Sequence, residues 1–360
     1  MKKYILKRLA LIPLTLFGIM LVNFLFIQLS PGGPVEQMML KMDGGNMSAT
    51  ARVSGSGAAA VEHASANSKY QGAQGVREEL KEQLKHEFGF DKPLYERFFV
   101  MMKKYLVFDF GKSFYQDKKV IDLIKEKMPV SVSLGIFSTL LIYLISIPLG
   151  IRKALKNGTK FDAWTSWVLI LGYAIPSFLF AILLVVLFAG GRYLSWFPLR
   201  GLVSDNWKSL STWGKITDYL WHLVLPVGAM VIGGFASLTM LTKNSFLEQM
   251  GENYTITARA KGLTQKQVLY RHVFRNAMLL IVSGFPAVLV GMLFTGSVLI
   301  EVIFSLDGLG LLGFESVMNR DYPVIFGTLY MFALLGLVLN LISDLTYRLV
   351  DPRIDFERRR

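Results

Sequence analysis

The sequence predicts an all-α polytopic membrane protein with six transmembrane helices. Hydrophobic residues make up 52% of its 360 residues, and the mean hydropathy of +0.43 is too high for an ordinary soluble protein. Six apolar stretches are long enough to cross a bilayer at a helical rise of about 1.5 Å per residue. Lys and Arg residues gather beside alternate connections between these stretches, which is typical of a multi-pass topology.

The predicted spans are residues 9–29, 130–151, 165–189, 222–241, 278–301 and 324–347. Five of these stretches contain a proline: Pro13, Pro148, Pro176, Pro226 and Pro286. Packed membrane bundles tolerate proline because neighbouring groups satisfy the backbone atoms that it frees. Each stretch is therefore predicted to form one transmembrane helix.

Residues 1–30 are predicted to be a retained first helix. Lys and Arg precede the apolar run, as they do in a signal peptide, but the run is long enough to span a bilayer. No small-x-small cleavage site follows it directly; the sequence Ser30-Pro31-Gly32-Gly33-Pro34 does.

The distribution of charge predicts that both termini are cytoplasmic. Basic residues flank the even connections and the termini: Lys2, Lys3, Lys7, Arg8, Arg152, Lys153, Lys156, Lys160, Lys243, Arg259, Lys261, Lys266, Arg271, Arg275, Arg348, Arg353, Arg358, Arg359 and Arg360. The connection between the last two spans carries Asp307, Glu315 and Asp321 against Arg320. The net charge of +13 is thus explained by orientation in the membrane, and no nucleic-acid partner is expected.

The long first connection, residues 31–129, is predicted to be an extracytoplasmic region. Its segment 43–75 is rich in Gly, Ala and Ser and buries too little apolar surface to fold, so a mobile loop is expected. Two amphipathic helices are expected at 76–88 and 93–107. Residues 130–360 are predicted to form a five-helix core.

No catalytic, metal or cofactor site is predicted in this chain. It has no cysteine, and its four histidines show no metal-ligand spacing. No Ser/His/Asp set or carboxylate pair suggests an enzyme. Gly111-Lys112-Ser113 imitates the end of a phosphate-binding loop, but Leu106 stands where the first glycine is needed.

A second misleading motif is Gly308-Leu309-Gly310-Leu311-Leu312-Gly313, which matches the dinucleotide-binding glycine pattern. It follows a transmembrane stretch, whereas the nucleotide motif follows a strand. A tight glycine turn is expected here instead.

The connection between the fourth and fifth spans, residues 243–278, contains the most informative segment. Tyr254 to Lys261 fits two helical turns, and Gly262 fits the left-handed position that ends such a helix. Thr264 and Gln267 then form a predicted capping box for a second helix. The residues alone leave two interpretations open: docking to a cytoplasmic partner, or contact with anionic membrane lipid.

This segment carries a family resemblance. Tyr254-(x)₂-Thr257-Ala258-Arg259-Ala260-Lys261-Gly262-Leu263, followed by Arg271-His272-(x)₂-Arg275-Asn276-Ala277, resembles the coupling loop of importer-type ABC transporter permeases of the oligopeptide and dipeptide branch. Further landmarks of this branch run along the chain: Ser30-Pro31-Gly32-Gly33-Pro34, Phe108-Asp109-Phe110-Gly111-(x)-Ser113, Glu301-Val302-(x)-Phe304-(x)₃-Gly308-Leu309-Gly310, Asn319-Arg320-Asp321-Tyr322-Pro323 and Asp351-Pro352-Arg353. The Ser/Ala/Gly insert and the Gly-Gly-Pro turn look most like the B subunit of Yej-type permeases for peptides and microcin C. Gly33 departs from the acidic residue that the branch more often has there.

The resemblance implies an importer that this chain cannot operate alone. Its expected partners are a second homologous permease subunit, a cytoplasmic ABC ATPase that binds ATP and Mg, and an extracytoplasmic solute-binding protein that delivers a peptide. The implied location is the bacterial cytoplasmic membrane. The residues that match the coupling motif are Thr257, Ala258, Arg259 and Gly262, with Tyr254, Lys261 and Leu263 beside them.

Ionisable residues inside the spans are candidates for function because they are costly in lipid. Glu301 has three possible roles, in order of preference: a cap for the glycine turn at Gly308 and Gly310, a contact with the partner permease at the outer gate, or a contact with solute. Asp344 is expected to pair with Arg348 one turn later.

Two other classes of protein remain as alternatives. A secondary, ion-coupled transporter would need inverted repeats with paired broken helices, and no convincing repeat is present. A non-transporting assembly factor or insertase would need no ATPase.

Overall fold

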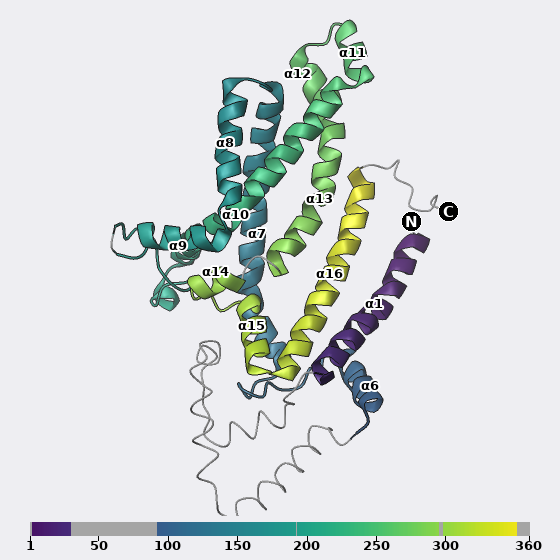
Figure 1. The fold of residues 1–360 in the computed structure, drawn as a ribbon, viewed down its shortest axis with the longest axis vertical. Coiled ribbons are helices and arrows are strands. Elements are labelled where there is room, and N and C mark those ends of the chain that lie inside the picture. Colours follow the sequence, from purple (N-terminus) through teal and green to yellow (C-terminus); the bar gives the residue numbers. More distant parts are fainter. Residues whose placement is uncertain (1, 30–91, 192, 295–297, 351–360) are drawn as a thin grey trace, which may run out of the picture. The chain divides into compact units, whose positions relative to one another are not determined.

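The computed structural model describes residues 2–29, 92–191, 193–294 and 298–350. The described residues form helices and irregular connections without a β-strand (Figure 1). The predicted mobile segment 43–75 and the predicted helix 76–88 lie outside the described residues. The second amphipathic helix is confirmed: residues 93–107 contain a helix from Leu94 to Tyr105.

The chain divides into two compact units. Unit 1 comprises Met1–Arg8, Lys127–Leu311 and Leu335–Arg360, and unit 2 comprises Leu9–Glu126 and Leu312–Leu334. Helices that lie within unit 1 are α8 (Lys160–Ala174), α9 (Ser177–Phe188), the 3₁₀ turn η1 (Trp207–Ser209), α10 (Thr212–Gly251), α11 (Asn253–Ala260), α12 (Gln265–Val268), the π-helical turn η2 (Leu269–Val273), α13 (Phe274–Phe294) and α14 (Val298–Ile303). Unit 2 contains α6 (Leu94–Tyr105), and both units share α1 (Lys2–Leu29), α7 (Val120–Leu155), α15 (Leu309–Asn319) and α16 (Tyr322–Val350).

Five helical stretches of the described residues are long and apolar enough to cross a membrane, and a bent pair of helices makes up to six. The first, second, fourth and sixth predicted spans are confirmed as α1, α7, α10 and α16. The fifth continues from α12 through η2 into α13. Its predicted last residues, near Glu301, belong instead to the separate helix α14.

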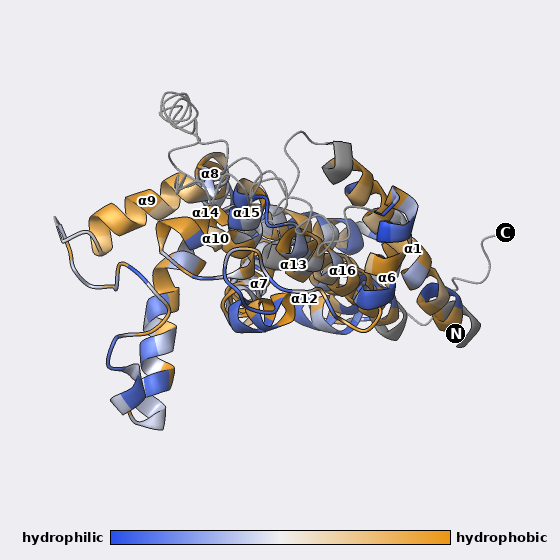
Figure 2. Cartoon of the chain, turned by 90° about the horizontal axis from the view of Figure 1, so that it is seen from below, coloured by the Kyte–Doolittle hydropathy of each residue, from blue (hydrophilic) through white to orange (hydrophobic). Residues whose placement is uncertain are grey.

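The stretch 165–189, predicted as one helix, is divided into two helices. Helices α8 and α9 meet at 96°. Ile175 has the extended backbone that a residue before proline prefers, and Pro176 has no N–H to continue the helical hydrogen bonds. After its first residue, α9 consists of apolar side chains, as its colouring in Figure 2 shows.

The core of unit 1 is built where α7 and α10 pass close to each other. A β-carbon on Gly150 of α7 would lie 2.5 Å from the Thr242 Cβ and 2.8 Å from the Thr239 carbonyl oxygen of α10. Further along, Gly234 of α10 leaves equally little room beside Ile142 of α7. Small residues thus let the two backbones approach, as in other membrane helix pairs.

Unit 2 is held by aromatic packing. The ring of Tyr105 lies edge-on to Phe110 and to Tyr330, at centroid distances of 4.8 and 5.5 Å. Phe98 of α6 packs in the same way against Phe17 of α1, at 5.2 Å. These contacts join α6 to α1 and α16 within the unit.

Asp344 pairs with a basic residue of another helix. Its Oδ2 lies 2.9 Å from an Arg8 guanidinium nitrogen, so the ion pair joins the first turns of α1 to α16 within unit 1. The side chain of Arg348 is outside the described part of the structure.

We predict that Gly150→Ala destabilises the protein because the added methyl group overlaps α10. The free energy of unfolding should fall by about 1–3 kcal/mol, which is measurable as a lower thermal unfolding midpoint of the purified protein in detergent. The control is Gly233→Ala, where an added β-carbon meets nothing within 4 Å. Equal losses in both variants would contradict the close approach of α7 and α10.

Candidate functional site

The turn after α11 has the predicted left-handed glycine. Gly262 has a φ of +83°. The Gly262 N–H donates to the Arg259 carbonyl at 2.9 Å, and the Leu263 N–H donates to the Ala258 carbonyl at 3.3 Å. This pair of bonds is the Schellman motif, which ends a helix by satisfying carbonyls that have no helical partner. The helix therefore ends where the sequence predicted, and the glycine sets the direction of the chain that follows.

Helix α11 has one face anchored in unit 1 and one face exposed. Thr255 is buried, and its hydroxyl donates to the Met250 and Glu252 carbonyls at 2.9 and 2.8 Å. Ala258 is buried in the core cluster, against which Leu263 packs. Tyr254 is half-buried, and its hydroxyl donates to Gln249 at 2.8 Å.

The opposite face of α11 is exposed. Thr257, Arg259, Lys261 and Gly262 are exposed, and so is Ile256, whose side chain is 59% exposed. The seven predicted residues thus form two sets. Four are exposed (Thr257, Arg259, Lys261 and Gly262), and three contact the rest of unit 1 (Tyr254, Ala258 and Leu263). Sequence reasoning missed Thr255 as an anchor and Ile256 as an exposed apolar residue, although both follow from helical spacing within the segment.

The second helix of this segment starts at the predicted capping box. The Thr264 hydroxyl accepts from the Gln267 N–H at 3.4 Å, and the Gln267 side chain accepts from the Thr264 N–H at 2.9 Å. Val268 and Val273 are buried in the core cluster. Between α12 and α13 the helix makes the π-helical turn η2, which the sequence pattern did not predict.

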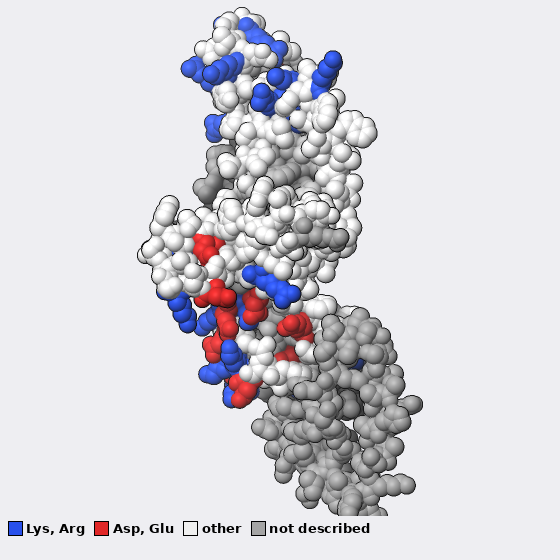
Figure 3. Space-filling view, turned by 90° about the vertical axis from the view of Figure 1, so that its left-hand side faces the viewer, with Lys and Arg blue, Asp and Glu red and all other residues white. Residues whose placement is uncertain are grey.

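Positive charge surrounds α11 and α12. Figure 3 shows Lys and Arg side chains gathered at the end of unit 1 that carries these two helices. The exposed cations of this connection are Arg259, Lys261, Lys266, Arg271 and Arg275. Such a surface suits an acidic protein groove or an anionic lipid surface, as the sequence already indicated.

A second group of polar contacts forms around Glu301 of α14, whose side chain is 0% exposed. Its Oε1 accepts from the Ser131 hydroxyl at 3.0 Å, and its Oε2 accepts from the Leu311 N–H at 2.7 Å. The Leu309 N–H donates to the Ser131 oxygen at 2.8 Å. Glu301 and Ser131 thus accept hydrogen bonds from N–H groups in the first turn of α15. These N–H groups have no acceptor within the helix itself.

The expected glycine turn is only partly present. Gly308 precedes α15, and a β-carbon there would lie 2.5 Å from the carboxyl group of Glu301, so a side chain at this position would displace that carboxyl group from its hydrogen bonds. Gly310 and Gly313, however, lie inside α15. The prediction that they form a turn was wrong, because the carboxyl cap lets a helix start at Leu309.

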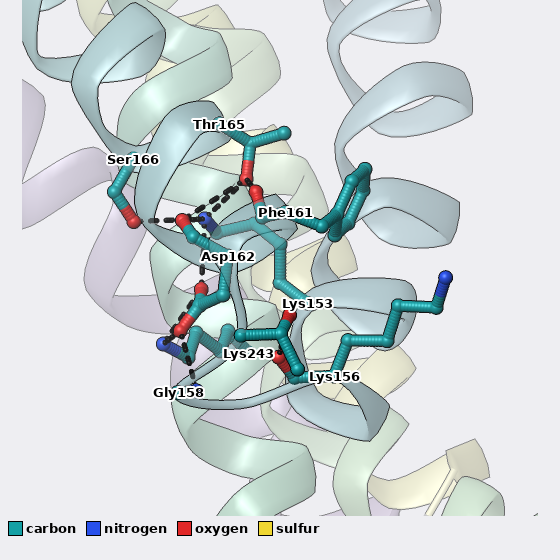
Figure 4. A network of polar contacts seen from close by, with 9 residues as sticks. Lys153, Lys156, Gly158, Phe161, Asp162, Thr165, Ser166 and Lys243 are labelled. Atoms are coloured by element: carbon teal, nitrogen blue, oxygen red, sulfur yellow. Dashed lines mark hydrogen bonds and ion pairs between the residues drawn. The ribbon is translucent and has the colours of Figure 1, made fainter.

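A third group of contacts centres on Asp162 and was missed by sequence reasoning. Asp162 lies in the first turn of α8 and is buried between Lys153 of α7 and Lys243 of α10 (Figure 4). Lys243 Nζ lies 2.9 and 2.7 Å from the two carboxylate oxygens, and Lys153 Nζ lies 3.0 Å from Oδ1. The Gly158 N–H donates to Oδ2 at 3.2 Å. The carboxylate therefore accepts four contacts, which is about its full capacity.

Lys153 is 0% exposed and is held by α8 alone. Its Nζ donates to the Asp162 carbonyl at 2.8 Å, the Thr165 hydroxyl at 2.7 Å and the Ser166 hydroxyl at 2.8 Å. The sequence placed Lys153 and Lys243 among the cations that flank the spans. Their burial was not predicted, and its cause is Asp162, whose distance from Lys243 in the sequence hid the pairing.

Two of the sequence landmarks contact each other in unit 2. The Ser113 hydroxyl and the Phe114 N–H both donate to Asp321, and the Tyr115 hydroxyl donates to the Asn319 carbonyl. These contacts join the segment before α7 to the start of α16 within unit 2.

Across the described residues, no group of three or more His, Cys, Asp or Glu side chains is arranged to hold a metal ion.

Comparison with known proteins identifies the family. Residues 146–356 match the family of binding-protein-dependent transport system inner membrane components. The chain belongs to this family.

Full-length relatives give a narrower placement in the family. The chain is 56% identical to the inner membrane ABC transporter permease protein YejB of Escherichia coli O157:H7 and 56% identical to the peptidoglycan transport system permease protein YejB of Agrobacterium fabrum, in both cases over the whole of both chains. It is 31% identical to the oligopeptide transport system permease protein AppB of Bacillus subtilis, over 99% of this chain and all of that one. The predicted class, a multi-pass permease subunit of an ABC importer in the inner membrane, is confirmed, and the secondary transporter is not favoured.

We predict that Glu301→Gln destabilises this family member. An amide has one accepting oxygen where the carboxyl group has two, so either Ser131 or the Leu311 N–H loses its acceptor. A buried donor without a partner costs about 1–3 kcal/mol, which a thermal unfolding measurement in detergent would detect. Asp205→Asn is the control, because Asp205 is exposed. An unchanged midpoint for Glu301→Gln would argue against the capping role.

Proposed function

We propose that this chain forms the solute pathway of a peptide importer together with a second, homologous permease subunit. A cytoplasmic ABC ATPase with bound ATP and Mg would drive transport, and an extracytoplasmic binding protein would deliver the solute. The main support is full-length similarity to permeases named for ABC, peptidoglycan and oligopeptide transport. The solute class is peptides or peptide-like compounds, and the Yej-type resemblance extends it to compounds like microcin C.

The exposed face of α11 is the proposed contact with the ATPase. Thr257, Arg259 and Lys261 would meet the ATPase, while Tyr254, Ala258 and Leu263 hold the helix to unit 1. Gly262 would fix the angle between α11 and α12. This division is supported by the exposure of the first set and the buried contacts of the second.

The proposed orientation places α11, α12 and both termini in the cytoplasm. Residues 31–129 would then be extracytoplasmic and residues 130–360 would form the permease core. The cations around α11 and α12 support this orientation, because cytoplasmic connections carry an excess of Lys and Arg.

Glu301, Gly308 and Gly310 would lie near the outer end of the pathway. Glu301 accepts two hydrogen bonds, one of them from the first turn of α15. This favours a role for Glu301 in holding α15 in place over direct contact with solute. Contact with the partner permease at the outer end of the pathway would then be made through α15.

The deciding experiment purifies the complex through a tag on this chain and reconstitutes it in liposomes. With the binding protein outside, uptake of a radiolabelled tripeptide should require ATP and Mg inside. Because the chain has no cysteine, Thr257→Cys offers a single site for crosslinking to the ATPase. Uptake without ATP would exclude the proposal.

We predict that Gly262→Val leaves membrane insertion intact but lowers peptide uptake per ATP hydrolysed. The left-handed backbone costs a residue with a side chain roughly 1–2 kcal/mol or more, so the end of α11 should shift. Gly251→Val is the matched control, since Gly251 lies in the last turn of α10 without a positive φ and with free space around it. Normal uptake per ATP in Gly262→Val would count against docking through α11.

A further inference from the structure

The buried pair of Asp162 and Lys243 joins two helices that are far apart in the sequence. Lys243 of α10 contacts both carboxylate oxygens of Asp162. Lys153 of α7 contacts only one of them and donates its other hydrogen bonds to groups of α8. The two lysines therefore have different mechanical effects. Lys153 holds the α7–α8 hairpin together, and Lys243 fastens that hairpin to α10.

Stability alone does not explain this arrangement. Two cations share one carboxylate, so the buried group carries a net positive charge. Buried ion pairs are usually no more stable than apolar side chains of the same volume, because desolvation offsets their attraction. Their distinctive property is a fixed geometry: both oxygens of Asp162 and its neighbour Gly158 must be in place at once.

The position of Lys243 connects this geometry to the coupling segment. Lys243 lies about 12 Å before the end of α10, at about 1.5 Å per residue. The only proline inside α10 is Pro226, well before this point, and α11 begins immediately after the cap residue Glu252. From Gly251 back to Lys243 the helix is uninterrupted, and the break at Glu252 is bridged by the bonds of Tyr254 and Thr255 of α11 to Gln249 and Met250 of α10, so a displacement of α11 reaches Lys243.

A second observation shows close packing of α7 against α10 beside Lys243. Gly150 of α7 approaches Thr242, the residue next to Lys243, so closely that no side chain fits between them. Helix α7 is therefore held against α10 by packing at Thr242, one residue along α10 from Lys243, which holds α8 by charge.

We propose that Asp162 and Lys243 are positioning residues that make the α7–α8 hairpin move as one body with α10 and α11. The proposal rests on the ATPase contact proposed for α11. The movement would continue past the bend at Pro176 into α9, which packs against α10 and α14. The hairpin would thus carry a cytoplasmic displacement to the part of unit 1 that holds Glu301.

The test compares Lys243→Met with Lys153→Met in the reconstituted complex. Each variant removes one buried cation and leaves Asp162 paired with the other lysine, so the buried charge changes equally. Only Lys243→Met removes the charged contact between the hairpin and α10. We expect uptake per ATP to fall roughly fivefold or more in Lys243→Met and to stay within twofold of wild type in Lys153→Met, with Lys243→Arg restoring it.

A distance measurement separates this role from a loss of stability. Spin labels on Asn157→Cys in the hairpin and Asn244→Cys on α10 occupy exposed positions in a chain without other cysteines. In the wild-type background we expect one narrow distance that is the same in the nucleotide-free and ATP-trapped complexes. In the Lys243→Met background the distance should broaden or change between the two states.

Three results would overturn the proposal: wild-type uptake per ATP in Lys243→Met, an equal loss in Lys153→Met, or an unchanged distance in Lys243→Met. If Lys243→Met is recovered only unfolded, the double variant Asp162→Asn/Lys243→Met retains the wild-type buried charge and takes its place. Failure of the ATPase contact is distinguishable, because normal uptake per ATP in Gly262→Val would reveal it independently.

Discussion

Charged and polar groups that leave water must be satisfied within the protein, and this requirement shapes unit 1. The Asp162 carboxylate accepts hydrogen bonds or ion-pair contacts from two lysines and a backbone N–H. The Glu301 carboxyl oxygens accept hydrogen bonds from a hydroxyl and a backbone N–H. Each of these carboxyl groups joins segments that are distant in the sequence. In an apolar solvent such contacts have no competing water, so they fix which helices remain together.

The segments that the sequence predicted well are governed by neighbours along the chain. The left-handed Gly262 and the capping box of Thr264 with Gln267 depend on residues at most five positions apart, so their types and spacing suffice. The apolar stretches were found for the same reason. Their ends were less accurate, because α7 and α10 extend beyond the apolar residues into polar turns.

The features that the sequence missed depend on contacts over long distances. Asp162 meets Lys243 across 81 positions and Ser131 meets Glu301 across 170. A sequence pattern shows that such residues are polar but not which partners they find. The sharp bend at Pro176 was missed for a related reason: proline permits both a kinked span and a broken one, and packing against α10 and α14 decides between them.

The π-helical turn η2 has a consequence for how this chain can change through evolution. Such a turn holds one residue more than an α-helical turn. The extra residue is taken up within the turn, so α12 and α13 on either side keep the faces they would have in a regular helix. Deleting one residue between Leu269 and Val273 would therefore give a continuous α-helix while the buried side chains on both sides, such as Val268 and Ala277, kept their neighbours.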